Sequence, residues 1–276
     1  MAEFSGHLSL QAAVKVNDPG RTTLAAQSFR APYHLSKPYW DAEARTLLVQ
    51  VVNPTAGILA GDKLESEIEV ESGAALLVTT PSASRVFKMI TGVAECRQKF
   101  RVAAGGWLEV MPEPLVPHRG CRYRQATRIE VEPGGELFFC DLLMSGRVAH
   151  DEAWEWEKLC LETEVRFGSE LVLRERFAQT GAELHRLAEL AGSGAGACFG
   201  NAVLVAVEGG RDFAWRDEIA ALHGDGFWVG VSALRRGGWS IKFVANDSVR
   251  LRNGQRAIRA ALAKRFPRMA CDPRKL

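Results

Sequence analysis

Alternating apolar and polar positions predict β-strands along most of the chain. From Leu64 to Val70, apolar or small side chains alternate with glutamates, which is typical of a half-buried strand with an acidic outer face. The segment 122–131 alternates in the same way and carries arginines on its polar face. Further strands are expected at residues 6–16, 21–30, 47–53, 95–102, 170–177, 227–234 and 239–245.

A short pattern, V-x-x-G-[AG]-x-L-x-[VF], occurs three times and begins at Val70, Val102 and Val131. The starts are 32 and 29 residues apart. In each copy one strand ends, a glycine-containing turn redirects the chain, and another strand begins. Recurrence at a near-constant period predicts strand pairs stacked on one another, as in a β-helix or a coiled β-sandwich. The predicted fold class is therefore dominated by β-structure.

One or two short helices are expected near the C-terminus. Residues 212–223 can form one, and the second is predicted to begin at Ser248 as the N-cap. The second helix has apolar residues at helical spacing from Ile258 to Phe266. Four basic residues are expected on its exposed side, namely Arg256, Arg259, Lys264 and Arg265. No long linker interrupts the pattern, so residues 1–276 are predicted to form a single domain.

The amino-acid composition limits the classes of protein to which this chain can belong. Hydrophobic residues make up 47% and charged residues 25%, as in ordinary soluble globular proteins. The N-terminus does not resemble a signal peptide, and no apolar run approaches the ~18 residues that span a bilayer, so we expect a cytoplasmic protein without membrane contact. The six cysteines form no C-x-x-C pair, which argues against a zinc site or a disulfide framework.

The charge is unevenly distributed, although the net charge is only +2. From Val231 to the end the chain carries 12 Lys and Arg but 2 acidic residues. Such a basic region indicates either nucleic acid or an acidic protein partner. The net charge of the whole chain is too mild to favour nucleic acid as the partner. The aromatic residues of the basic region also fit a hydrophobic core, whereas nucleic-acid binding would need them exposed.

Three carboxylates are candidates for chemistry. Asp62 ends the glycine-containing loop 53–62, Asp141 interrupts the apolar run 137–144, and Glu175 lies between two arginines. In a structural interpretation Asp62 caps a turn, Asp141 bonds backbone groups at a strand kink, and Arg174 or Arg176 neutralises Glu175. In a functional interpretation they form a wet internal passage, a weak site for a divalent cation or a carboxylate pair. Of the six dispersed histidines, His118, in a proline-flanked loop, is the most site-like.

Several stretches together resemble one family. They are NPTAGILAGD at 53–62, LLVTTPSASRVFK at 76–88, LEVMPEPLVPHRGCRYRQ at 108–125, LFFCDLLMSGRVAHDE at 137–152 and LRERF at 173–177. Their order and spacing are similar to the urease accessory protein UreD family, called UreH in some bacteria, from roughly residue 5 to residue 265.

The resemblance implies a right-handed, β-helix-like β-sandwich and a non-catalytic role. Such a protein is expected to bind apo-urease, to recruit UreF and the GTPase UreG, and to pass Ni²⁺ to urease through an internal tunnel. It would hold no tight cofactor, only transient Ni²⁺. The resemblance leaves open a dimer of such complexes.

The resemblance also implies a role for each of the candidate residues. Asp62, Asp141 and Glu175 would contact Ni²⁺ transiently, because sparse oxygen ligands attract a cation without trapping it. Neutral oxygens along the tunnel are expected from Thr79, Thr80 and Ser82. The basic side chains of the closing helix, Arg256, Arg259, Lys264 and Arg265, are expected to contact protein partners. The alternative is a carbohydrate-active hydrolase, which would need a carboxylate pair roughly 5–10 Å apart across an open groove.

Overall fold

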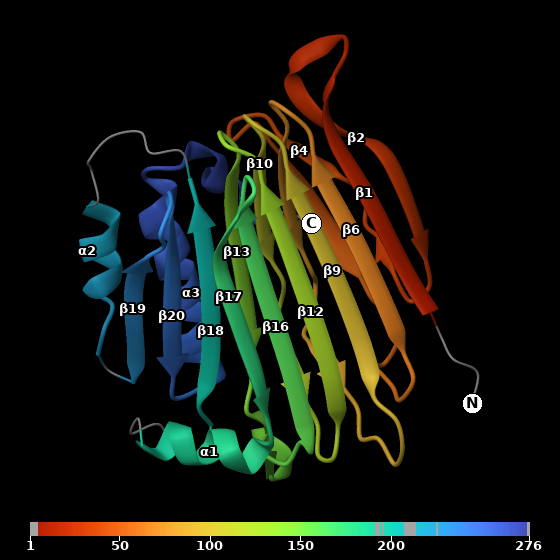
Figure 1. Cartoon of the computed structure of the whole chain (residues 1–276), viewed down its shortest axis with the longest axis vertical. Helices are drawn as coiled ribbons and strands as arrows, with labels where there is room; N and C mark the ends of the chain where they lie inside the picture. Colours follow the sequence, from red (N-terminus) through yellow and green to blue (C-terminus); the bar gives the residue numbers. More distant parts are fainter. Residues whose placement is uncertain (1–4, 191–193, 195, 207–213, 225, 275–276) are drawn as a thin grey trace.

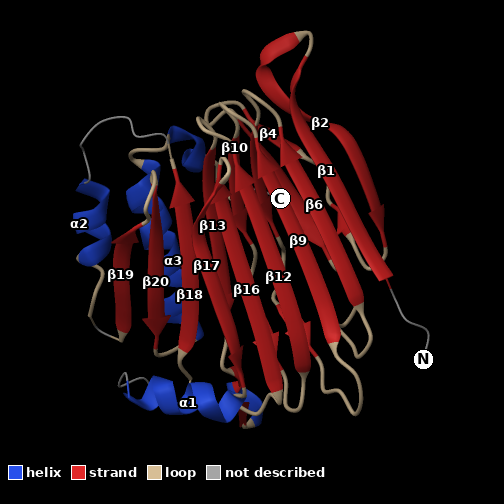
Figure 2. Cartoon of the chain, in the orientation of Figure 1, coloured by secondary structure: helices blue, strands red, loops and turns tan. Residues whose placement is uncertain are grey.

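Two large β-sheets form most of the molecule (Figures 1 and 2). The computed structural model describes residues 5–190, 194, 196–206, 214–224 and 226–274. One sheet has seven strands, in the spatial order β17 (Glu170–Gln179), β16 (Lys158–Phe167), β12 (Arg122–Val131), β9 (Ala94–Val102), β6 (Lys63–Val70), β1 (Ser5–Lys15) and β2 (Asp18–Arg30).

The second sheet has eleven strands and is wider than the first. Its main order is β19 (Phe227–Ala233), β20 (Gly238–Ala245), β18 (Cys198–Val205), β13 (Glu136–Leu143), β10 (Trp107–Met111), β7 (Ala75–Thr79), β5 (Thr46–Val52) and β3 (His34–Leu35). Short strands β4 (Tyr39–Asp41), β8 (Ser84–Val86) and β11 (Leu115–Pro117) join it, and β14 (Gly146–Arg147) pairs with β15 (Glu152–Ala153). Figure 1 shows β18, β20 and β19 continuing past β17, where the narrower sheet ends.

The threefold pattern marks the corners at which the chain passes from one sheet to the other. Each copy contains the end of a strand in the seven-stranded sheet and the start of a strand in the wider one: β6 to β7, β9 to β10 and β12 to β13. Val70, Val102 and Val131 are aligned across adjacent parallel strands. Successive coils therefore stack in register, which confirms the predicted all-β, β-helix-like fold.

A glycine in the left-handed region turns each corner. Gly73, Gly105 and Gly134 have φ of 75°, 74° and 92°, a conformation that costs an L-residue free energy because its Cβ approaches the backbone. The turns also stack, since the Gly105 amide donates a hydrogen bond of 2.8 Å to the Gly134 carbonyl. These glycines are required by the corner geometry.

In the described part of the chain, three α-helices lie outside the sheets: α1 (Gly181–Leu190), α2 (Ala214–Ala220) and α3 (Ser248–Ala263). Helix α3 packs Leu251, Ile258 and Leu262 on apolar side chains of β18 and β20. Short 3₁₀ turns occupy Val148–His150 and Pro267–Ala270. No helix in the described ranges is both long and apolar enough to cross a membrane.

The helix predictions need three corrections. Helix α1 was not expected, because its ten residues follow a strand pattern without a clear change of period. The N-cap of α3 is Asp247, not Ser248, since the Asp247 carboxylate accepts bonds from the amides of Val249 and Arg250 at 2.9 and 2.8 Å. Of the segment 212–223, residues 212 and 213 lie outside the described part of the chain, and α2 covers Ala214–Ala220.

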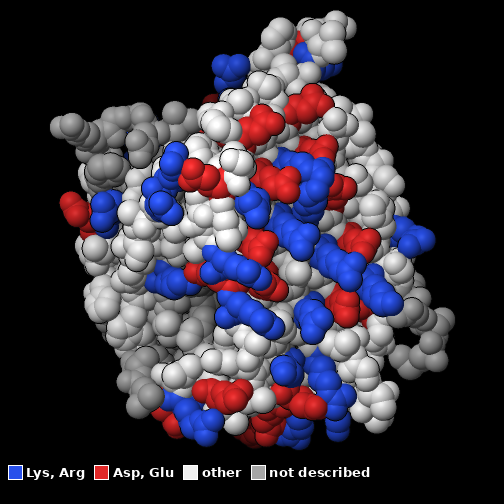
Figure 3. All heavy atoms as spheres, viewed as in Figure 1, with Lys and Arg blue, Asp and Glu red and all other residues white. Residues whose placement is uncertain are grey.

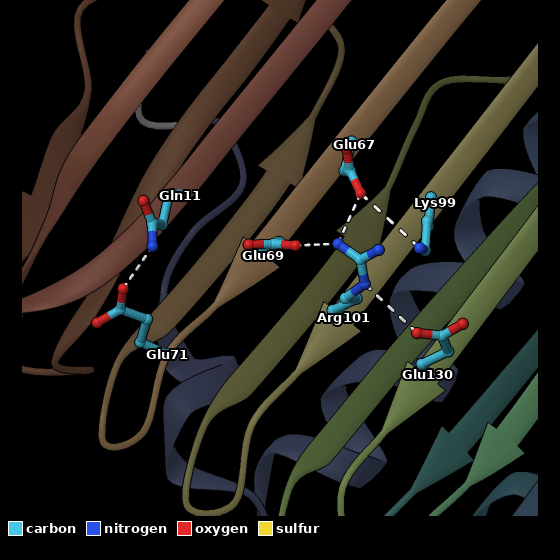
Figure 4. A network of polar contacts seen from close by, with 7 residues as sticks. All are labelled: Gln11, Glu67, Glu69, Glu71, Lys99, Arg101 and Glu130. Atoms are coloured by element: carbon cyan, nitrogen blue, oxygen red, sulfur yellow. Dashed lines mark hydrogen bonds and ion pairs between the residues drawn. The ribbon is translucent and has the colours of Figure 1, made fainter. Parts of the chain in front are cut away.

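The outer face of the seven-stranded sheet is an array of compensating charges (Figure 3). Its acidic strand β6 lies beside the basic strand β9. Figure 4 shows Arg101 between Glu67, Glu69 and Glu130. The distance from Arg101 Nη1 to Glu67 Oε1 is 2.6 Å, and the Lys99 ammonium lies 3.9 Å from Glu67 Oε1. Each half-exposed pair contributes little to stability, about 0–1 kcal/mol. Together they keep this face charged and solvated.

We expect Gly134→Ala to lower the free energy of unfolding by about 1–2 kcal/mol, because alanine must adopt a strained positive φ. Steric contact is not the cause, since the nearest atom to a Cβ at this position would be 3.7 Å away. Urea denaturation measures the change. Gly230→Ala is the matched control, because Gly230 has an ordinary φ and open space around it. Equal stability of both variants would contradict the corner argument.

Candidate functional site

A cavity of about 960 Å³ lies between the two sheets. Strands from both sheets line it, together with the loops 53–58 and 80–85. Five of the six residues predicted for an internal passage lie on its wall: Thr79, Thr80, Ser82, Asp141 and Glu175. Asp62 is not among the lining residues. The structure thus brings two of the three candidate carboxylates into one space.

A row of polar side chains crosses the inner face of the seven-stranded sheet. Because the strands are aligned in register, Ser66, Gln98, Thr127, Thr163 and Glu175 follow one another on neighbouring strands. The Thr127 hydroxyl donates a hydrogen bond of 3.0 Å to the Gln98 side-chain oxygen. Apolar clusters flank the row on both sides along the strands. The cavity is therefore polar at one level of the interior and apolar above and below it.

A second row faces it from the wider sheet. Asp141, Asn201, Lys242 and Gly230 are aligned on β13, β18, β20 and β19. Asp141 and Asn201 are direct register partners in an unbroken strand pair, so the strand is not kinked at Asp141. Within the described part of the chain, the Asp141 carboxylate has no hydrogen bond or ion pair. The predicted structural role of Asp141 at a kink is wrong.

Burial raises the pKa of Asp141 from 3.8 to about 7. The side chain is enclosed by protein, yet it keeps some accessible surface because it faces the cavity. Among the described residues, no basic side chain pairs with it to oppose the effect of burial. An unpaired carboxyl in such a setting is costly when charged, which is a frequent property of functional positions.

Glu175 joins the two sheets at the edge of the cavity. Its Oε2 accepts a hydrogen bond of 2.6 Å from the Asn201 amide, and its Oε1 pairs with the Lys242 ammonium. The prediction that Arg174 or Arg176 neutralises Glu175 is wrong. Alternate residues of a strand face opposite sides, and Arg174 instead pairs with Glu162 and Glu164 on the outer face, at 3.1 and 3.2 Å.

The hydroxyl oxygens of Thr79 and Thr80, two of the three predicted, are held by the backbone at the cavity wall. The Thr79 hydroxyl donates to the Met111 carbonyl at 2.8 Å. The Thr80 hydroxyl accepts from the Glu113 amide at 2.8 Å and donates to the Ser82 carbonyl at 3.3 Å. These bonds fix the loop after β7 against the loop after β10, and they shape one wall of the cavity.

Asp62 holds its own loop. Its Oδ2 accepts a hydrogen bond of 2.8 Å from the Leu59 amide, and its own amide donates to the Leu59 carbonyl at 3.1 Å. The predicted turn-capping role is confirmed. Its contact with a passing cation stays a prediction.

The basic residues of the C-terminal helix divide into two kinds. Arg256, Lys264 and Arg265 are exposed, and the Lys264 ammonium lies 2.7 Å from Glu218. Arg259 was expected on the exposed side, and this is wrong: its side chain is 12% exposed and forms a two-point ion pair with the fully buried Glu109, at 2.6 and 3.0 Å. Its other Nη2 bond, 2.7 Å long, goes to the Cys271 carbonyl. Arg259 follows Gln255 by one turn on the stripe that faces the sheet.

His118 lies away from the cavity, on the loop before Cys121. Its ring packs edge-on against Phe87 with centroids 4.8 Å apart, and its buried Nε2 has no hydrogen-bond partner within the described part of the chain. Burial, and after it the charge of Arg147, lower the pKa of His118. The buried, packed ring favours a structural role for this residue.

Sequence reasoning missed two residues of the cavity, Asn201 and Lys242. Each is a polar interruption in an apolar strand, of the same kind that identified Asp141. Cys96 was also overlooked; it lines the cavity, and burial raises the pKa of its thiol to about 11. Among the residues that the structure describes, no group of three or more His, Cys, Asp or Glu side chains is placed to hold a metal ion.

The fold and the site define a class of protein: a coiled β-sandwich whose stacked strands enclose a cavity crossed by rows of polar residues. Its sequence matches the profile of the UreD urease accessory protein over residues 5–275. It is 63% identical to the urease accessory protein UreD of Opitutus terrae over 275 residues, covering 99% of this chain and all of the relative. The UreD proteins of Yersinia pseudotuberculosis and Yersinia enterocolitica are 39% identical over 148 residues, which cover 53% of this chain and about 45% of each relative. The chain belongs to the UreD family of urease accessory proteins.

Replacing Asp141 by asparagine is expected to stabilise the protein at pH 8 and to lose this effect as the pH falls. The folded-state pKa of about 7 exceeds the unfolded value of 3.8, so the charged form opposes folding above pH 7 and the penalty disappears as the pH falls through this range to about 4. We expect a gain of roughly 2 kcal/mol at pH 8, because partial solvation reduces the full effect. Urea denaturation at pH 8 and pH 4.5 measures it, and a gain independent of pH would contradict the burial argument.

Arg259→Met is expected to lower the free energy of unfolding by about 3 kcal/mol, because Glu109 would remain buried without its partner. The exposed neighbour gives the control: Arg256→Met should change stability by less than about 0.5 kcal/mol. The double variant Glu109→Gln, Arg259→Met should recover part of the loss in thermal or urea unfolding. If both arginine variants unfold alike, the ion pair does not have this role.

Proposed function

We propose that this chain is a non-catalytic scaffold that binds apo-urease together with UreF and UreG and conducts Ni²⁺ to the urease active site through its internal cavity. The main observation in support of this proposal is that Asp141 and Glu175 lie on the wall of one cavity between the sheets. Family membership supports an accessory role in urease maturation, and GTP hydrolysis is assigned to UreG.

The chemistry of the cavity suits transit better than storage. Asp141, Glu175 and the hydroxyl and amide oxygens near them are ligands that a divalent cation tolerates. The lining includes the carboxylates of Asp141 and Glu175 and the ammonium of Lys242, which pairs with Glu175. This balance prevents a deep electrostatic trap, and well-separated oxygens bind a cation weakly and release it.

The partner surface is proposed at the C-terminal end of the chain. Arg256, Lys264 and Arg265 are exposed there, beside the covered outer face of the wider sheet. They offer positive charge to an acidic protein surface.

The hydrolase alternative has no support from the family assignment. Glu175 is also engaged by Lys242 and Asn201, whereas a hydrolytic pair needs both carboxyl groups directed at substrate.

The test is co-expression of this chain with its cognate urease subunits, UreF and UreG, followed by pull-down and measurement of nickel per urease active site. We expect Asp141→Ala and Glu175→Ala to lower the initial rate of nickel loading roughly ten-fold, because each removes an oxygen ligand for the cation from the cavity wall. Assembly of the complex should be unchanged.

Glu164→Ala is the matched control, since Glu164 lies on the outer face of β16 and pairs with Arg174. It should load nickel normally. Equal nickel loading by all variants would overturn the conduit, and loss of assembly in the cavity variants would instead assign these carboxylates a structural role.

A further inference from the structure

We propose that Lys242 is an internal stand-in for the transported cation: its ammonium occupies the cation position between Glu175 and Asn201, and an incoming divalent cation must displace it. This inference rests on the proposed function, because it specifies how the same cavity avoids retaining its cargo. It assigns a role to a residue outside the set of carboxylates.

The position of the ammonium is that of a bound cation. It pairs with Glu175 Oε1 and lies 3.4 Å from Asn201 Oδ1, so two oxygens from opposite sheets face one positive charge. Asn201 simultaneously donates from its amide nitrogen to Glu175 Oε2 at 2.6 Å. That bond orients the Asn201 oxygen toward Lys242. The two oxygens are therefore arranged for a cation before any metal arrives.

The adjacent strand extends this arrangement into the cavity. Asn201 lies between Lys242 and Asp141 in the aligned row, and neighbouring strands are about 4.8 Å apart. Asp141 is therefore the next oxygen donor inward from the Glu175–Asn201 pair. A cation that replaced the ammonium would meet an unpaired carboxyl one strand further in.

Lys242 has room to leave. Its side chain is 62% exposed, whereas that of Glu175 is 22% exposed, so the ammonium lies on the solvent side of the carboxylate. Its outer register partner is Gly230, which has no side chain, and even a Cβ there would have no neighbour within 4 Å. The flexible four-carbon stem of lysine can swing toward this open side.

The function of such a counter-ion is to keep affinity low. With Lys242 in place, the charge of Glu175 is already neutralised. A divalent cation must displace the ammonium before it can bind, which lowers its apparent affinity. Without Lys242, the same oxygens would face the cavity with an uncompensated negative charge. Cations would then bind more tightly and leave more slowly. An ordinary salt bridge between the sheets, by contrast, would affect stability alone.

The experiment measures Ni²⁺ binding to the purified complex of this chain with UreF by equilibrium dialysis. We expect Lys242→Met to raise the affinity for Ni²⁺ about ten-fold and to slow its release to a chelator, because a competing charge is removed. Lys242→Arg should stay close to the parent protein. Adding Glu175→Gln to Lys242→Met should abolish the gain.

Lys99→Met is the matched control, because Lys99 pairs with Glu67 at 3.9 Å on the outer face and has no part in the cavity. It should leave Ni²⁺ affinity unchanged. A Lys242→Met protein that folds normally and binds Ni²⁺ like the parent would overturn the proposal, as would a gain that persists with Glu175→Gln. Thermal unfolding checks that each variant is folded.

The outcomes separate this proposal from the conduit itself. If Asp141→Ala and Glu175→Ala reduce nickel loading of urease while Lys242→Met binds Ni²⁺ normally, the conduit stands and the role of Lys242 is refuted. If Lys242→Met gains Glu175-dependent affinity while no cavity variant affects urease, the cation position is established and the conduit is refuted.

Discussion

In-register stacking of the coils is the constraint on which the rest of this molecule depends. Parallel neighbours place equivalent residues side by side, so a side chain at one height in one coil is followed by its counterpart in the next. Apolar positions then build continuous clusters, and a polar position becomes a row. Ser66, Gln98 and Thr127 form such a row because the three coils share one alignment. Without the stacking, each would be an isolated buried polar group.

The unequal width of the sheets converts this row into a site with an open side. The seven-stranded sheet ends at β17, whereas the wider sheet continues through β18, β20 and β19 (Figure 1). Glu175 on that last strand therefore reaches polar partners that belong to the opposite sheet. Asp141 lies deeper, on β13, which has β10 and β18 as its neighbours, and among the described residues it has no such partner. Two carboxylates of the same cavity thus have different surroundings because of their distance from the sheet edge.

Local patterns in the sequence were sufficient for the fold and for part of the site. The repeated valine and glycine positions predicted the corners, and the break in the apolar run identified Asp141. Asn201 and Lys242 were missed because their importance depends on the pairing of β13, β18 and β20, which are far apart in the sequence. Arg259 was expected to be exposed because helical periodicity alone does not reveal that Glu109 lies opposite it. In the structure Arg259 lies one turn after the buried Gln255, on the same face of the helix. Long-range pairing, rather than local propensity, limited the prediction.

The stacked corners also make the architecture modular. Each coil of about 30 residues adds one strand to each sheet, one glycine turn to the stack and one residue to the polar row. Inserting another coil between β9 and β12 would lengthen the row by a single strand spacing, about 4.8 Å, and its new member could be chosen freely among polar side chains. The length of the polar row and its chemistry are thus set by separate features of the sequence, which offers a route to redesigning one without the other.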